Sequence, residues 1–286
     1  MLDYRMDTFL KLCEIMNYRI TAEQLNMTQP AVTQHIHYLE RVYGCRLFSY
    51  DGRSLAKTDA AKLLEEYARS ARYDQQTVQR AIAAGHEREI LRIGATKTIG
   101  EYILPTRFVQ LWQEGVYQPS LLVDNTAHLL ELLDRGELDI ALIEGFFDRT
   151  AYGAKLYRQE PFVGICAKGH AFAGRKISIE ELLAETLVVR ESGSGTRAVL
   201  EQLLEQSNYA IDSFRSVCCV SSFAVTTQLV AAGLGISFVY QAVAESTQNF
   251  DVFYLNASPI LREMNYVYLK NSSAQRWVAV LEGEGN

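Results

Sequence analysis

The chain has 286 residues, a length that predicts about two domains of ordinary size. Hydrophobic residues make up 48% and charged residues 22% of the sequence, a globular composition that excludes a wholly disordered, collagen-like or proline-rich protein. The net charge of −6 excludes a protein that coats nucleic acid through bulk positive charge. Residues 1–60 are neutral by themselves, with seven basic and seven acidic side chains, so any DNA contact must come from their local arrangement.

The first 60 residues predict three helices followed by a small hairpin. Apolar residues at helical spacing predict a helix over residues 6–16, a short second helix around residues 22–25 and a third over residues 28–43. The glycine-containing turn at residues 51–53 follows a short apolar pair and predicts the hairpin. This order of elements is the outline of a winged helix-turn-helix.

A long helix is expected next, because no proline or glycine occurs from Thr58 to about Ala84. Its apolar stripe is thin and interrupted, and an isolated helix of this kind usually needs a partner. We therefore expect this helix to dimerise with a second copy of the chain. A solvated linker helix is the alternative.

Beyond Glu89 the pattern changes to alternating strands and helices, as in βαβ units of a mostly parallel sheet arranged in two similar lobes. The expected strands are residues 91–95, 121–125, 138–144, 162–167, 186–190, 214–220, 235–240 and 265–270, and a last helix is expected over residues 273–281.

The uncharged stretch between Arg215 and Glu245 is long enough to span a membrane. Its Ser, Thr, Gln and Gly residues favour a buried strand, helix and strand instead.

Residues 22–48 read AEQLNMTQPAVTQHIHYLERVYGCRLF, and with them the sequence resembles the LysR-type transcriptional regulators over almost its whole length. The resemblance implies an α/β protein with an α-rich N-terminal domain, and an effector domain similar to the type 2 periplasmic binding-protein fold. The implied domains are a winged helix-turn-helix at 1–58, a linker and dimerisation helix at 59–87, and an effector-binding domain at 88–286, with lobe I at 88–160 and 267–286 and lobe II at 161–266.

The candidate recognition helix begins at Thr28, a good N-cap, and Pro30 is tolerated in a first helical turn. The first turn of such a helix enters the major groove, where a glutamine can pair with adenine and a proline ring can pack on a thymine methyl. A solvated helix face is the alternative. The candidate DNA-binding residues are Arg19, Thr28, Gln29, Pro30, Thr33, Gln34, Arg53 and Lys57.

Two departures from the family pattern concern contacts to the DNA backbone. Ser49 and Tyr50 stand where the wing usually carries arginine, and Thr58-Asp59-Ala60-Ala61 replaces the usual Thr-x-x-Gly at the head of the linker helix. Each phosphate neutralised steepens the salt dependence of binding, so we expect a shallow salt dependence here.

Hydroxyl side chains and glycines at the expected strand-to-helix junctions predict an anion site, because helix N-termini present free N–H groups. The resemblance implies that a co-inducer binds between the lobes, and favours a carboxylate, a phosphorylated metabolite or an inorganic oxyanion. Ordinary helix capping is the alternative at each position. The candidate effector-binding residues are Thr96, Thr98, Asn125, Thr126, Ser194, Thr196 and Arg197, with Ser222 and Phe223 as weaker candidates. Lys97 would add charge if it faces the cleft, and Tyr240 is weaker still.

The five cysteines show no C-x-x-C spacing, which favours a reducing cytoplasm over a disulfide framework or a zinc site. Cys218 and Cys219 are adjacent in an expected strand, so their side chains would point to opposite sides. We therefore expect buried apolar cysteines here, and not the switching disulfide of redox-sensing family members.

These features together predict a sequence-specific DNA-binding regulator, and not an enzyme, that senses a small anionic effector. Its expected partners are double-stranded DNA, the effector and further copies of itself in a homodimer or tetramer, with RNA polymerase a candidate. No membrane contact, metal or cofactor is expected, and the charged N-terminus without an apolar signal segment favours the cytoplasm. The alternative is an enzyme on a binding-protein-like fold with an N-terminal partner-binding domain. It is less favoured, because the five histidines are scattered and His35 and His37 lack metal-ligand spacing.

Overall fold

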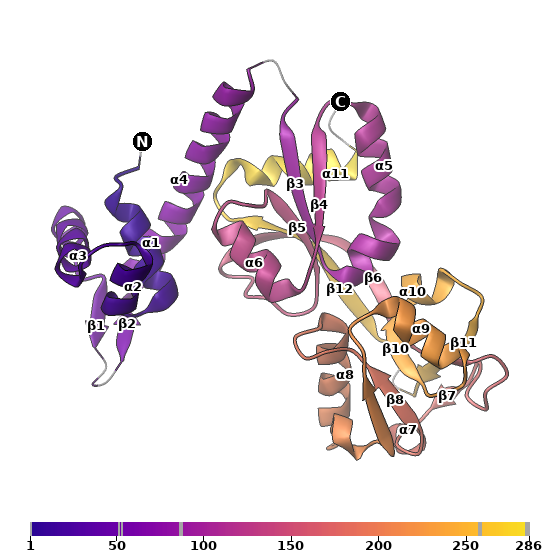
Figure 1. Cartoon of the computed structure of the whole chain (residues 1–286). Coiled ribbons are helices and arrows are strands. Elements are labelled where there is room, and N and C mark those ends of the chain that lie inside the picture. The colour runs from indigo at the N-terminus through magenta and orange to yellow at the C-terminus, as the bar shows by residue number, and fades with distance from the viewer. Residues whose placement is uncertain (1, 51, 53, 86–87, 257–258, 284–286) are drawn as a thin grey trace. The chain divides into compact units, whose positions relative to one another are not determined.

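The computed structural model describes residues 2–50, 52, 54–85, 88–256 and 259–283, and it divides into two compact units (Figure 1). The first unit comprises residues 1–87, 134–136 and 269–276. The second comprises residues 88–133, 137–268 and 277–286.

The first unit is a winged helix-turn-helix followed by a long helix (Figure 1). Its elements are α1 (Arg5–Ile15), α2 (Tyr18–Gln24), α3 (Gln29–Tyr43), the antiparallel hairpin of β1 (Phe48–Tyr50) and β2 (Leu55–Lys57), and α4 (Asp59–Ala84). The helices that the sequence predicts here are confirmed.

Local chemistry fixes where these helices begin and end. Asn17, Thr28 and Thr58 each accept a hydrogen bond from a backbone N–H in the first turn of α2, α3 and α4. Met16 and Gly44 adopt left-handed backbone conformations at the ends of α1 and α3. Behind these caps lies a core of fully buried side chains, namely Phe9, Leu12, Ile36, Leu39 and Leu47.

The second unit is a two-lobed α/β structure. Its strands are β3 (Ile90–Ala95), β4 (Gln118–Val123), β5 (Ile140–Glu144), β6 (Tyr152–Ala167), β7 (Lys176–Ile177), β8 (Thr186–Val189), β9 (Ser216–Cys219), β10 (Ser237–Tyr240), β11 (Phe250–Leu255) and β12 (Leu261–Leu269). Its helices are a π-helical turn (Ile99–Ile103), α5 (Pro105–Glu114), α6 (Thr126–Asp134), α7 (Ile179–Leu182), α8 (Gly195–Glu205), a 3-10 turn (Ile211–Ser213), α9 (Phe223–Ala231), α10 (Gln241–Glu245) and α11 (Arg276–Glu282), the last preceded by a 3-10 turn (Ser273–Gln275).

The strands of the larger sheet follow the order β4-β3-β5-β12-β6-β11-β7, with β10 also paired to β6. The expectation of a mostly parallel sheet is wrong. β3 runs parallel to β4 and β5, but β12 is antiparallel to β5, and both β10 and β11 are antiparallel to β6. Two strands were also missed, β7 because it has only two residues and β11 because Asp251 interrupts its apolar pattern.

Strand β6 belongs to both lobes. Tyr157 in its first half packs on Tyr266 of β12, while residues 162–167 pair with β10 and β11. Pro161 separates the two halves, and it has no N–H to contribute to a ladder. The uncharged stretch before Glu245 forms β9, α9 and β10, and no helix in the described part of the chain is long and apolar enough to cross a membrane.

Gly164 of β6 faces the ring of Phe253 on β11, and a Cβ atom at this glycine would lie 2.2 Å from the ring carbon Cζ. Because Phe253 is fully buried, its ring cannot move aside. We expect Gly164→Ala to destabilise the second unit by about 1–3 kcal/mol, measured by urea unfolding. In a Phe253→Leu background the same change should cost clearly less. An equal cost in both backgrounds would show that the ring is not the obstacle.

Candidate nucleic-acid interface and inter-lobe ligand site

Helix α3 begins with exposed polar residues, and its opposite side is apolar and buried. Thr28, Gln29, Pro30 and Gln34 are exposed, while Val32, Ile36 and Leu39 are fully buried. Thr33 is half-buried, and its hydroxyl donates to the carbonyl of Gln29 at 3.1 Å. The structure therefore brings the five predicted recognition residues together on the N-cap and first two turns of α3.

The predicted phosphate contacts lie in different surroundings. Arg19 is largely exposed and paired with Glu23 across one turn of α2. Lys57 is bound at 2.7 Å to the buried carboxylate of Glu65, so it has a structural partner inside the unit. Arg53 lies outside the described residues. Arg46, whose side chain is 76% exposed just before the hairpin and 3.3 Å from Glu40, is a further candidate phosphate contact that the sequence analysis did not name. Its position next to the Leu47–Phe48 pair could have indicated it.

In the second unit, the two lobes meet at an inter-lobe junction formed by residues 96–98, 125–126, 144, 190–197 and 221–223. Lys97 reaches from the end of β3 in one lobe to the carbonyl of Ser221 in the other, at 2.9 Å. Gly145 and Gly195 also approach closely, since a Cβ atom on Gly145 would lie 3.5 Å from the Cα of Gly195. The nine predicted effector residues fall within the segments that define this junction, and among them Phe223 packs across it on Tyr102, with ring centres 5.6 Å apart.

Three of the predicted threonines serve one buried residue that the sequence did not indicate, Glu144 at the end of β5. The backbone N–H of Glu144 donates to the Thr96 hydroxyl at 3.3 Å, and the Thr98 hydroxyl donates to Glu144 Oε1 at 2.9 Å. The Thr126 hydroxyl reaches the carbonyl of Glu144 at 3.5 Å. Asn125 is exposed, and its side-chain oxygen caps α6 by accepting from the N–H of His128.

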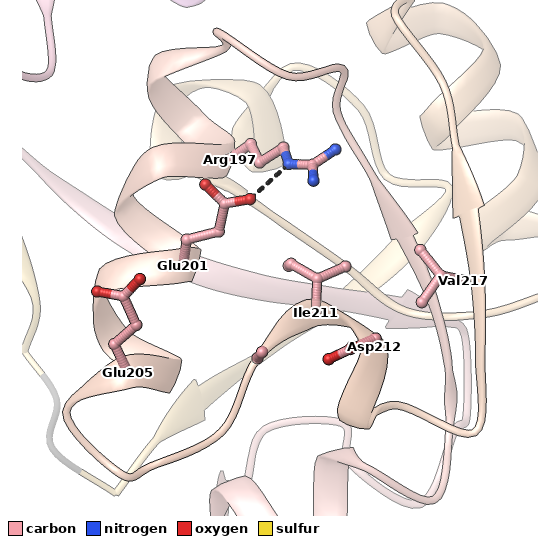
Figure 2. A pocket seen from close by; sticks show the side chains of 7 residues that line it. Arg197, Glu201, Glu205, Ile211, Asp212 and Val217 are labelled. Carbon is pink, nitrogen blue, oxygen red and sulfur yellow. Dashed lines mark hydrogen bonds and ion pairs between the residues drawn. The ribbon is translucent and has the colours of Figure 1, made fainter.

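The start of α8 divides the predicted residues Ser194, Thr196 and Arg197. Ser194 is the N-cap residue, but its side chain makes no capping bond. Thr196 is buried, and its hydroxyl has no partner among the described residues. Arg197 donates through Nε to Glu201 at 2.7 Å and through Nη1 to the carbonyl of Arg190 at 3.3 Å, and it lines a pocket of about 460 Å³ beside Glu205 and Asp212 (Figure 2).

Ser222 and Phe223 open α9. Ser222 is exposed, and its hydroxyl accepts from the backbone N–H of Val225, an ordinary cap. Phe223 is buried, and the Arg190 guanidinium lies 4.4 Å from the centre of its ring. Ser222 and Asn125 therefore cap helices, as the alternative interpretation predicts.

A second charged group that the sequence did not indicate is the adjacent pair Arg190 and Glu191. Two hydrogen bonds of 2.8 and 2.9 Å join the guanidinium to the carboxylate, and Lys97 approaches the same carboxylate at 3.4 Å. Although burial opposes ionisation, these cations hold the pKa of Glu191 down to about 2. Its negative charge therefore offsets one of the two cations, which leaves this group of three side chains with a net positive charge.

Burial raises the pKa of Glu144 to about 8, because the hydrogen bond from Thr98 and the nearby Arg190 only partly compensate the loss of solvation. The carboxyl group is consequently neutral at pH 7. Its second oxygen, Oε2, is buried without a partner in the described part of the chain.

The expectation of buried cysteines at positions 218 and 219 is wrong. Both are exposed, as are all four residues of β9. Strand β9 pairs with β8 in a separate two-stranded sheet, so neither of its faces is covered as a central strand of the large sheet would be.

Two family models match the chain. Residues 4–62 match a bacterial regulatory helix-turn-helix protein of the lysR family, and residues 84–284 match a LysR substrate binding domain.

Characterised relatives show the same resemblance. The chain is 28% identical to the transcriptional regulator CysL of Bacillus subtilis, covering 92% of this chain and 89% of CysL. It is 30% identical to the regulator CbbR of Sinorhizobium medicae, covering 82% and 75%.

Solved structures share the fold. A hydrogen peroxide-bound mutant of Corynebacterium glutamicum OxyR is 25% identical, with a TM-score of 0.61 and coverage of 98% of this chain and 91% of that one. The regulatory domain of Synechocystis CcmR in complex with 2-PG is 22% identical, with a TM-score of 0.61 and coverage of 68% and 97%. CbnR in complex with its target DNA is 18% identical, with a TM-score of 0.56 and full coverage of both chains.

The raised pKa of Glu144 makes stability depend on pH. The folded chain retains this proton up to about pH 8, whereas the unfolded chain releases it near the ordinary value of 4.5. Between these values this carboxyl should lower the stability of the second unit by about 1.4 kcal/mol per pH unit. We expect Glu144→Gln to remove that slope in denaturant unfolding followed from pH 5 to pH 8. The exposed-site variant Glu137→Gln should keep it, and a slope unchanged in Glu144→Gln would contradict the assignment.

Proposed function

Because this chain belongs to the LysR family of bacterial helix-turn-helix regulators, we propose that it is a sequence-specific transcriptional regulator whose second unit binds a small anionic effector. In this proposal residues 1–58 bind DNA, 59–87 link and dimerise, and 88–286 bind the effector, with lobe I at 88–160 and 267–286 and lobe II at 161–266. The protein acts in the cytoplasm, without a cofactor and not as an enzyme.

The DNA-binding part of this proposal rests on the exposed start of α3. Gln29 and Gln34 are exposed beside Thr33, and the apolar side of the helix fixes their orientation. In the proposed complex these side chains contact base edges in the major groove, Thr28 and Pro30 lie at the groove wall, and Arg19, Arg53 and Arg46 contact phosphates. Lys57 contributes only if it leaves Glu65.

Helix α4 supports a dimer. One side of the helix packs into the core through Ala61, Leu64 and Ala68. The other side carries a row of exposed apolar residues at helical spacing, consisting of Leu63, Tyr67, Val78 and Ile82. Tyr67 and Val78 also line a groove of about 640 Å³. We propose that a second copy of α4 covers this row, and that such dimers pair into tetramers as the family resemblance implies.

The effector proposal rests on the inter-lobe junction. Lys97, Arg190 and the uncapped start of α8 supply positive charge and free N–H groups there. The structurally similar CcmR domain was solved with 2-PG. An anion that bound here would contact groups from both lobes, and would therefore favour one relative arrangement of the lobes over others.

We expect Gln29→Ala to lower the preference for the cognate duplex over duplexes with a changed base pair by about tenfold, because a two-bond contact between glutamine and adenine contributes about 1–3 kcal/mol of discrimination. Fluorescence anisotropy with cognate and scrambled duplexes measures this. Arg46→Ala should weaken binding to every sequence alike. Gln113→Ala, an exposed glutamine on α5, is the matched control. Equal affinity of the wild type for scrambled DNA would contradict the proposed function.

We expect a small anion to raise the thermal stability of the full chain, since a ligand at a hundred times its dissociation constant stabilises by about 2.7 kcal/mol. The panel contains sulfate, inorganic phosphate, 2-PG and simple dicarboxylates. Thr196→Val removes one buried hydroxyl of the junction and should reduce the shift, whereas Thr106→Val at an exposed position on α5 should not. An equal increase in thermal stability in both variants would show that the ligand does not bind at the start of α8.

A further inference from the structure

Several buried polar atoms near the junction have no hydrogen-bond partner in the described part of the chain. They are Glu144 Oε2, the hydroxyls of Thr196 and Tyr240, and Arg262 Nε. Folded proteins leave few buried polar groups unpaired, because each one costs free energy comparable to a lost hydrogen bond. Three such oxygens around one part of the fold indicate a ligand that brings the missing partners.

The backbone carbonyl and Cγ of Glu144 lie against the start of α8. A Cβ atom on Gly195, the first residue of α8, would lie 3.0 Å from the carbonyl oxygen of Glu144 and 3.5 Å from its Cγ. Thr196, with its unpartnered hydroxyl, is the next residue along the helix. Tyr240 comes from β10, which also packs on α8. Burial, with a smaller contribution from nearby Glu144, raises the pKa of its hydroxyl well above the ordinary value.

The charged groups around Glu144 are committed elsewhere. Arg190, from the end of β8, is bound to Glu191. Glu160, from β6, accepts the backbone N–H of Ala242 at 2.7 Å and an ion pair from Arg158. Arg262, from β12, donates through Nη2 to the side-chain oxygen of Gln202 at 3.0 Å. Among the described residues, Glu144 therefore has no ion-pair partner, which agrees with its raised pKa.

We propose that Glu144 is part of the effector site and binds the effector as a neutral carboxylic acid, donating the hydrogen on Oε2 to an anionic oxygen of the ligand. The hydroxyls of Thr196 and Tyr240 are further donors to the same ligand. This inference rests on the proposed function of the junction as an anion site.

The proposal defines a ligand class. A carboxylic acid that keeps its proton can donate to an anion, whereas a carboxylate in the same place would repel it. The site therefore accepts oxygen anions such as sulfate, phosphate or carboxylates. It binds them together with the Glu144 proton, so their affinity falls as the solution becomes more alkaline.

Sulfate is the probe, because its charge is constant across the neutral and alkaline range. Calorimetric titration of the full chain should show affinity falling about tenfold from pH 7 to pH 9, the factor by which the protonated fraction of a group titrating near pH 8 decreases. Glu144→Gln, whose amide donates at every pH, should bind with similar affinity at both pH values. Glu137→Gln, at an exposed site, should follow the wild type.

A second variant keeps the carboxyl group. Thr98→Val removes the hydrogen bond that favours ionisation of Glu144, so the loss of sulfate affinity should move to higher pH. Parallel pH profiles for the wild type, Glu144→Gln and Thr98→Val would overturn the role of Glu144 and leave an anion site without it. Absence of saturable sulfate binding in all variants would overturn the anionic effector itself together with this inference.

Discussion

Hydrogen bonds to one buried residue, Glu144, organise the side of the junction that belongs to the first lobe. Glu144 ends β5 in the interior, and the hydroxyls of Thr96, Thr98 and Thr126 bond to its N–H, side chain and carbonyl. Thr96 and Thr98 both follow β3, and Thr126 starts α6, so the polar groups of one residue join these two segments to the end of β5. The first residue of α8 must be glycine-sized because the backbone of Glu144 lies against it.

This arrangement explains which parts of the site could be predicted. A threonine after a strand is visible in the sequence, and the positions of Thr96, Thr98 and Thr126 at one junction follow from the order of strands. Their partner was not visible, because Glu144 closes an apolar strand and resembles the first polar residue of a loop. The contacts of Arg197 were equally hidden, because they depend on Glu201 one turn along α8 and on the carbonyl of Arg190.

The fold was more predictable than the site for a related reason. Helices α1, α3 and α4 carry their own caps and apolar periodicity, so local signals suffice. Strands β7 and β11 pair with each other across a long stretch of sequence. The antiparallel direction of β12 depends on how the chain passes between the lobes, which no local sequence pattern shows. The exposure of Cys218 arises in the same way, because the strand that carries it pairs outside the main sheet.

Pro161 gives the shared strand β6 a mechanical property. Bending a strand normally stretches the hydrogen bonds that each residue donates to its neighbours, but a proline donates none. A donor is therefore missing from the ladder of β6 at the boundary between the half that packs on β12 and the half that pairs with β10 and β11. The two halves of one strand can therefore hold separate sets of neighbours, one in each lobe.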